Sequence, residues 1–180
     1  MIRFLASQSA ADRRSLMSYL LFNLSRSERA FFHVTQSGGA YYISAQSGAG
    51  SVLRINHTIA YQDLLQTVRA SGTVRIGFAE NITFVGGSGR VAVDYGGGAT
   101  VPASISTTRD VEAYVSRLGN PAGVPGTNGK TISDPISIIL AHELLGHARL
   151  MLIGQPSGQP EAIQSENDYR RGRGIGQRQP

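Results

Sequence analysis

The stretch Ile139–Leu152, "ILAHELLGHARLML", predicts the buried centre of the fold. It is a helix-forming run with apolar residues on every side, which is typical of a helix surrounded by other elements. Three polar side chains, His142, Glu143 and His147, interrupt the run. A carboxylate is costly to bury unless a positive or hydrogen-bonding group meets it. We therefore expect this helix to carry a site as well as part of the core.

The spacing of the two histidines differs from the familiar pattern H-E-x-x-H of zinc peptidases, because His142 and His147 are five residues apart and not four. Residues five apart diverge by about 140° around a regular α-helix, too far for two imidazoles to bind one ion. A π-bulge of one residue returns both positions to one face. Gly146 tolerates unusual backbone angles and offers a place for this bulge. The sequence thus predicts two metal ligands on a distorted helix.

A catalytic zinc takes three protein ligands and keeps one open position. The carboxylates that follow the motif are Glu161, Glu166 and Asp168. If residues 154–160 turn the chain into an antiparallel helix pair, His147 and Glu166 both lie about 9 Å from the turn. This geometry favours Glu166 as the third ligand. Glu161 is the alternative, although its charge can equally complement the start of its own helix.

The remaining roles follow from the chemistry of peptide hydrolysis. Glu143 is expected to take a proton from a zinc-bound water and to pass it to the leaving nitrogen. Tyr169 and Arg170 are candidates for stabilising the oxyanion. Asn167 or Asp168 could instead orient a ligand histidine. For these four residues the alternative is a place on the surface of a helix.

The motif also carries a resemblance. "HELLGH" matches the zinc motif typical of the dipeptidyl peptidase III family, in which this longer spacing binds zinc. "HELLGHA" followed by "ENDYRRGRG" resembles the zinc-metallopeptidase domains of bacterial polymorphic (Rhs-type) toxins and the related type III effector peptidases. The resemblance covers about the last quarter of the chain. It implies Zn²⁺ as cofactor, Glu166 as a ligand, and secretion or delivery into a target cell. It also implies a protein substrate in that cell, and an immunity or inhibitor protein as a partner.

Composition bounds the remaining possibilities. The 180 residues are 41% hydrophobic and 16% charged, as expected for one globular domain. The chain has no cysteine, which excludes disulfides and thiolate metal sites, and no apolar run long enough to span a membrane. The net charge is +5, and basic residues are concentrated near the C-terminus. We expect residues 172–180 to form a flexible, solvated tail; contact with nucleic acid is the less favoured interpretation.

Hydrophobic periodicity and turn residues predict an α+β fold, a mostly antiparallel sheet with an N-terminal helix and a zincin-like helical C-terminal half. Helices are expected at residues 9–24, 61–72, 107–119, 135–153 and 161–171. Strands are expected at residues 30–36, 40–46, 51–57, 73–79, 82–87, 89–98 and 99–105. Residues 120–134 are expected to form a long loop in which Asp134 caps the following helix.

Three functions are compatible with these features. The first is a zinc-dependent endopeptidase that acts as the toxic or effector domain of a secreted bacterial system. The second is a binding module that is stabilised by a metal but not catalytic. The third is a toxin directed at nucleic acid through the basic C-terminal tail.

Overall fold

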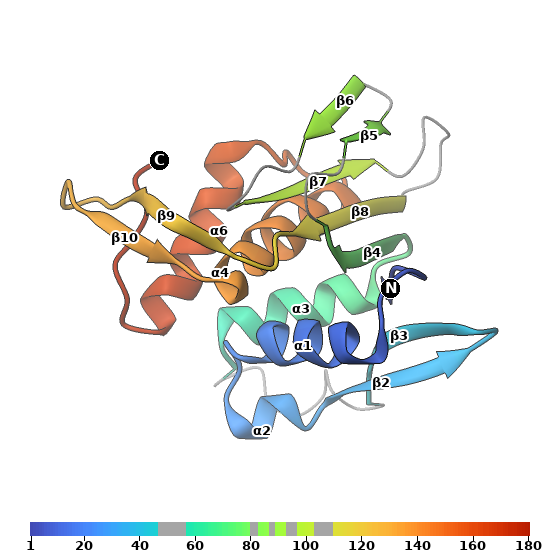
Figure 1. The fold of residues 1–180 in the computed structure, drawn as a ribbon. Coiled ribbons are helices and arrows are strands. Elements are labelled where there is room, and N and C mark those ends of the chain that lie inside the picture. The colour runs from blue at the N-terminus through green and yellow to red at the C-terminus, as the bar shows by residue number, and fades with distance from the viewer. Residues whose placement is uncertain (47–56, 80–82, 87–88, 93–96, 103–109) are drawn as a thin grey trace.

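A six-stranded mixed sheet, covered by helices, organises the molecule in a computed structural model (Figure 1). The structure describes residues 1–46, 57–79, 83–86, 89–92, 97–102 and 110–180. The strands are β1 (Ile2–Phe4), β2 (Phe32–Ser37), β3 (Ala40–Ala45), β4 (Thr73–Phe78), β5 (Thr83–Gly86), β6 (Gly89–Ala92), β7 (Gly98–Pro102), β8 (Asp110–Val115), β9 (Asn120–Pro125) and β10 (Thr131–Asp134). The helices are α1 (Ala10–Leu21), α2 (Arg26–Arg29), α3 (Ile59–Arg69), α4 (Ile136–Ala141), η1 (His142–Ala148), α5 (Arg149–Leu152) and α6 (Gln159–Gly172).

The strands of the main sheet lie in the order β2-β3-β1-β4-β8-β7. β4 is parallel to both β1 and β8, whereas the other neighbours in the sheet are antiparallel. β5–β6 and β9–β10 form two further antiparallel pairs. Most pairs are therefore antiparallel, and the expected α+β class agrees with the structure.

The core lies on one face of this sheet. Val74 and Ile76 of β4 and Val111 and Ala113 of β8 are buried at alternate positions, as the two-residue period of a strand requires. Apolar residues of α1, α3 and the helix that contains the motif join them in one cluster. The motif is thus anchored against the centre of the sheet.

Several local predictions are confirmed. The helix expected at residues 9–24 is α1, which Ser9 caps with a reciprocal hydrogen bond to Asp12. The strands expected at 30–36 and 40–46 are β2 and β3, which pair as a hairpin. α4, η1 and α5 together cover the predicted helix at 135–153. Residues 51–56 of the expected strand 51–57 lie outside the described residues.

The helix predicted at 107–119 is wrong, because residues 110–115 form strand β8. β8 lies between β4 and β7 and is paired with both. Asp110 and Glu112 are more exposed than the buried Val111 and Ala113, and this alternation in the first half of β8 fits a strand. The pairing on both sides outweighs the helical propensity of the segment.

The loop predicted at 120–134 is also wrong, because β9 and β10 form a hairpin in this region. Gly123 lies within β9 at the irregularity in the pairing with β10. It has a φ of 70°, and a Cβ there would collide with the backbone of Ile132, so glycine is required at this position. Asp134 does not cap α4: Pro135 is the N-cap residue, and it makes no side-chain capping bond.

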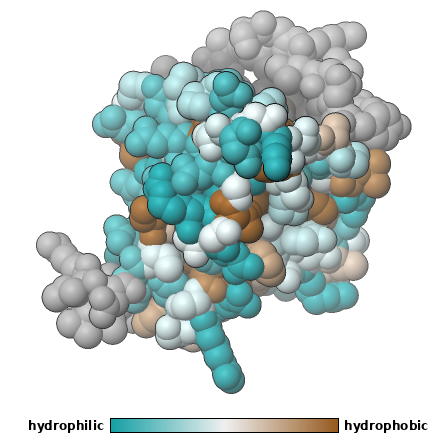
Figure 2. Space-filling model, turned by 90° about the vertical axis from the view of Figure 1, so that its left-hand side faces the viewer, coloured by the Kyte–Doolittle hydropathy of each residue, from teal (hydrophilic) through white to brown (hydrophobic). Residues whose placement is uncertain are grey.

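The surface seen from the left of Figure 1 is largely hydrophilic, with a small group of hydrophobic residues near its middle (Figure 2). In the described part of the chain, every helix is too short or too polar to cross a membrane.

Candidate metal centre

The motif forms a π-helix inside an otherwise regular helix. Residues His142–Ala148 make up this segment, and the Arg149 N–H donates to the carbonyl of Leu144, five residues earlier. The predicted bulge is therefore confirmed. It brings His142 and His147 together, with ring centroids 4.9 Å apart and the rings at 82°.

Gly146 contributes to this helix differently from the expectation. Its φ is not in the left-handed region, and a Cβ at this position would lie 2.8 Å from Cα of Ala162 on α6. Glycine is required here for the close approach of two helices, and not for an unusual backbone angle.

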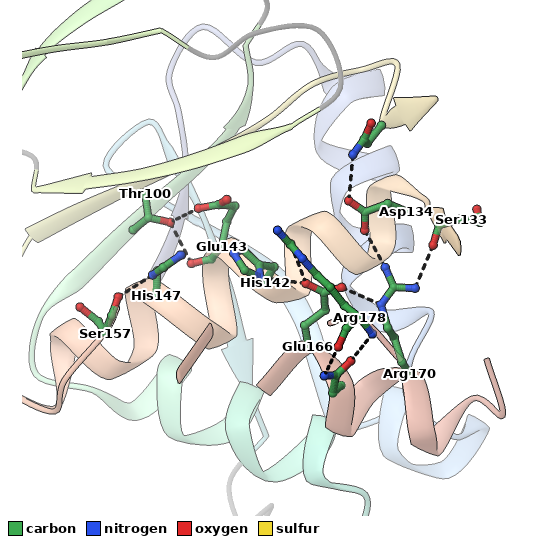
Figure 3. Close-up of polar contacts among 12 residues, drawn as sticks. Thr100, Ser133, Asp134, His142, Glu143, His147, Ser157, Glu166, Arg170 and Arg178 are labelled. Atoms are coloured by element: carbon green, nitrogen blue, oxygen red, sulfur yellow. Dashed lines mark hydrogen bonds and ion pairs between the residues drawn. The ribbon is translucent and has the colours of Figure 1, made fainter. Parts of the chain in front are cut away.

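Both histidines are held through Nδ1. Nδ1 of His147 lies 2.6 Å from the carbonyl oxygen of Ser157, and Nδ1 of His142 lies 2.9 Å from Oε2 of Glu166 (Figure 3). A carbonyl oxygen and an ionised carboxylate can only accept, so we assign the ring proton to Nδ1 in each histidine. The lone pair is then on Nε2. Metal-binding histidines commonly show this arrangement.

Glu143 is buried beside the histidines, against the edge strand β7. The Thr100 hydroxyl lies 2.7 Å from Oε2 of Glu143 and 2.9 Å from its carbonyl oxygen, so its single proton can serve either acceptor. A Cβ on Gly98 would overlap the Glu143 side chain, so glycine is needed for this packing. Burial raises the pKa of Glu143, although His142 and Thr100 oppose this shift.

Glu166 is completely buried, and both of its oxygens accept hydrogen bonds. Oε1 accepts from Nε of Arg170 at 2.6 Å, and Oε2 accepts from His142 and, at 3.1 Å, from Arg178. Burial raises the pKa of Glu166, but the bonds from His142 and Arg170 outweigh it and hold this pKa below its ordinary value. The carboxylate is thus ionised and fully engaged.

Arg170 connects Glu166 to a second buried carboxylate. Its Nη2 lies 2.8 Å from Oδ1 of Asp134, and its Nη1 donates to the carbonyl of Ser133 at 2.8 Å. Burial, together with the charge of Glu166, raises the pKa of Asp134. Arg170 therefore stabilises two buried anions and is not placed as an oxyanion donor. Its position four residues after Glu166 was a readable sign of an ion pair within the helix.

The C-terminal segment, residues 177–179, is docked, whereas we expected residues 172–180 to be a flexible tail. The Thr127 N–H donates to the carbonyl of Gln177, and the Gln179 N–H donates to the carbonyl of Pro125. The side chain of Asn167 bonds both the N–H and the carbonyl of Arg178. Sequence reasoning missed Arg178, because nothing local relates it to Glu166.

The other expected site residues lie elsewhere. Tyr169 is buried in the core, and its hydroxyl is 3.4 Å from Asp63 on α3. Asp168 pairs with exposed Arg171. Glu161 borders a different hollow, which also contains Asp63. The structure thus brings His142, His147, Glu143 and Glu166 together but leaves Tyr169 outside.

A polar cleft of about 160 Å³ opens at the motif and is bordered by Gly98, Asn120, His142, Glu143 and Arg178. A larger hollow of about 470 Å³ has a mostly apolar lining and is bordered by Arg170. Asp134, Glu143, Glu166 and Arg178 are the charged residues that border the polar cleft. Two of the three carboxylates, Asp134 and Glu166, already pair with Arg170 or Arg178.

The donor set fits zinc in part. Two imidazoles with their lone pairs on Nε2 and a buried carboxylate are ligand types that zinc accepts. Within the described residues, however, no three His, Asp or Glu side chains converge closely enough to hold an ion.

No family model matches the chain, and neither the curated proteins nor the solved structures contain a match.

Proposed function

We propose that the protein is a zinc-dependent metallopeptidase, an endopeptidase that cleaves a protein in a target cell. One observation carries this proposal: the π-helix turns His142 and His147 toward each other, and each Nδ1 is already bonded to an acceptor. This leaves the two Nε2 lone pairs for a metal. Glu143 borders the same cleft as His142, and we assign it the role of general base.

Zinc, when bound, would polarise the scissile carbonyl and lower the pKa of a bound water. His142 and His147 would hold it through Nε2. Glu143 would accept the proton of that water on its carboxylate and deliver it to the leaving nitrogen. Thr100 keeps the Glu143 side chain in place through its hydroxyl.

An extended peptide could approach along β7, the outermost strand of the main sheet. Thr100 connects this strand to Glu143. In the part of the chain that the structure describes, no strand pairs with the outer edge of β7. Such an edge offers backbone donors and acceptors with which a peptide can pair. The resemblance of "HELLGHA" and "ENDYRRGRG" to toxin and effector peptidases supports a protein substrate, delivery by a bacterial secretion system and control by an immunity protein.

The proposal is tested with the variant Glu143→Gln. The zinc-loaded wild type should cleave a proteome-derived peptide mixture, as followed by mass spectrometry. Glu143→Gln should keep its zinc but lose activity by about 100-fold or more. Glu161→Gln makes the same chemical change outside the cleft and should retain activity. Equal cleavage by wild type and Glu143→Gln would contradict the proposal.

A binding module stabilised by a metal is the second candidate. A structural zinc takes four protein ligands, and the described residues contain no such group of His, Asp or Glu side chains. A metal that serves only stability does not need Glu143. In that case Glu143→Ala would leave partner binding intact, while His142→Ala would unfold the domain. The nucleic-acid alternative gains no support, because the N–H and carbonyl of Arg178 bond to Asn167 and its side chain contacts Glu166. The nucleic-acid alternative would be supported if deletion of residues 172–180 abolished toxicity but left peptidase activity intact.

A further inference from the structure

The hydrogen bonds of Glu166 define what its carboxylate can do for a metal. Oε2 accepts from Nδ1 of His142 at 2.9 Å. The two nitrogens of an imidazole point in diverging directions. A group bonded to Nδ1 therefore faces away from an ion bound at Nε2, and cannot ligate that ion while it orients the ring.

Two guanidinium groups fix Glu166 in this orientation. Arg170 bonds Oε1 at 2.6 Å and is itself anchored by Asp134 and the Ser133 carbonyl. Arg178 bonds Oε2 at 3.1 Å. A carboxylate has about four lone-pair sites. The hydrogen bonds that Glu166 accepts from Arg170, Arg178 and His142 occupy three of them. The carboxylates of Glu166 and Asp134 balance the charges of the two guanidinium groups. This network therefore offers no net negative charge to an added cation.

Arg178 reaches Glu166 because the C-terminal segment is docked. The side chain of Asn167 accepts from the Arg178 N–H at 2.6 Å and donates to its carbonyl at 2.9 Å. Gly126 and Arg178 also form an isolated β-bridge. Figure 3 shows the Arg178 side chain extending toward His142 and Glu166. Its side chain is 25% exposed, so the segment forms one wall of the cleft and not only a surface contact.

We propose that Glu166 is a positioning residue that acts on the metal through His142, and that the C-terminal segment completes the site through Arg178. This inference rests on the proposed metal centre but not on peptidase activity. It differs from the role expected from the sequence, in which Glu166 is a ligand. Partners that orient a ligand histidine typically change metal affinity by about 10- to 100-fold, whereas the ligand set is retained.

The test uses metal binding alone as its probe. Zinc affinity is measured by competition with a chromophoric chelator, and the ligand set is read from the visible spectrum of the Co²⁺-loaded protein. Glu166→Gln should weaken zinc binding by about 10- to 100-fold with unchanged cobalt bands. Asn167→Ala removes the side-chain hydrogen bonds that hold the backbone of Arg178. This variant should weaken zinc binding less than Glu166→Gln does. Glu161→Gln, the matched control on the same helix, should bind like wild type.

A second measurement needs no variant and so does not depend on folding. The chain has only four histidines, so long-range ¹H–¹⁵N spectra can resolve each ring. In the zinc-loaded wild type, His142 should keep its proton on Nδ1 and bind through Nε2. Zinc on Nδ1 of His142 would overturn the inference, as would altered cobalt bands in Glu166→Gln.

The outcomes separate this inference from the proposed function. Zinc binding with the expected histidine spectra, but without peptide cleavage, would leave the inference standing and remove the peptidase. Wild-type protein that binds no zinc would overturn both.

Discussion

Gly146 sets how closely the helix that carries the motif can approach α6. A Cβ at this position would lie 2.8 Å from Cα and 3.2 Å from the carbonyl oxygen of Ala162. These are backbone atoms, so a rotamer change cannot relieve the overlap. Since Glu166 also lies on α6, any separation of the helices would move it away from His142.

Gly146→Ala should therefore destabilise the protein by about 1–3 kcal/mol, the usual cost of overpacking. Urea unfolding measures this change. The matched control is Gly172→Ala, because no atom lies within 4 Å of a Cβ there and its φ is ordinary. If the two variants were equally stable, the close helix contact would not be a constraint.

Glu166 gives the metal-free protein a defined response to acid. Its pKa is lowered from 4.5, because the bonds from His142 and Arg170 outweigh burial. A carboxylate with a depressed folded pKa contributes stability above its unfolded pKa, and this contribution is lost as pH falls through the folded pKa. Asp134 and Glu143 have raised pKa values and act in the opposite direction.

Comparison with Glu166→Gln isolates the contribution of Glu166. Between about pH 5 and pH 3, the free energy of unfolding of the wild type should fall more steeply than that of the variant. Parallel pH dependence would mean that the Glu166 contacts do not stabilise the ionised form.

At the scale of elements, the sequence was informative where the signal is local. The apolar run around HELLGH and the five-residue spacing of His142 and His147 predicted a distorted buried helix. β8 was not predictable in this way, because "DVEAYV" becomes a strand by pairing with β4 and β7. The β9–β10 hairpin likewise depends on cross-strand pairs such as Val124 with Ile132.

The docked C-terminal segment makes a prediction at the same scale. The amide of Arg178 donates to Asn167 and that of Gln179 donates to Pro125, so both should exchange with solvent more slowly than in an unstructured chain. Hydrogen exchange followed by NMR measures this protection. Asn167→Ala should reduce it at Arg178. Exchange of both amides at unstructured rates would contradict docking and support a flexible tail.

At the scale of the whole molecule, the site is assembled from distant parts of the chain. His142, Glu143 and His147 come from η1, Thr100 from β7, Glu166 from α6 and Arg178 from the C-terminal segment. Sequence spacing could predict that the three motif residues of η1 lie together. With an antiparallel helix pair assumed, it could also predict that Glu166 lies near them. It could not place Thr100 or Arg178, because tertiary packing alone brings them to the motif. The same limit explains why Tyr169, three residues after Glu166, instead reaches Asp63.

The proposed metal centre requires that the π-helix bring His142 and His147 to one metal ion. The most direct test is the zinc content of the purified protein after exposure to zinc and removal of the excess, beside His142→Ala and His147→Ala. His33→Ala controls for histidine loss away from the motif. We expect one zinc per chain in wild type and in His33→Ala, and loss of zinc in both motif variants. Wild-type protein without zinc, or zinc retained after removal of either motif histidine, would contradict it.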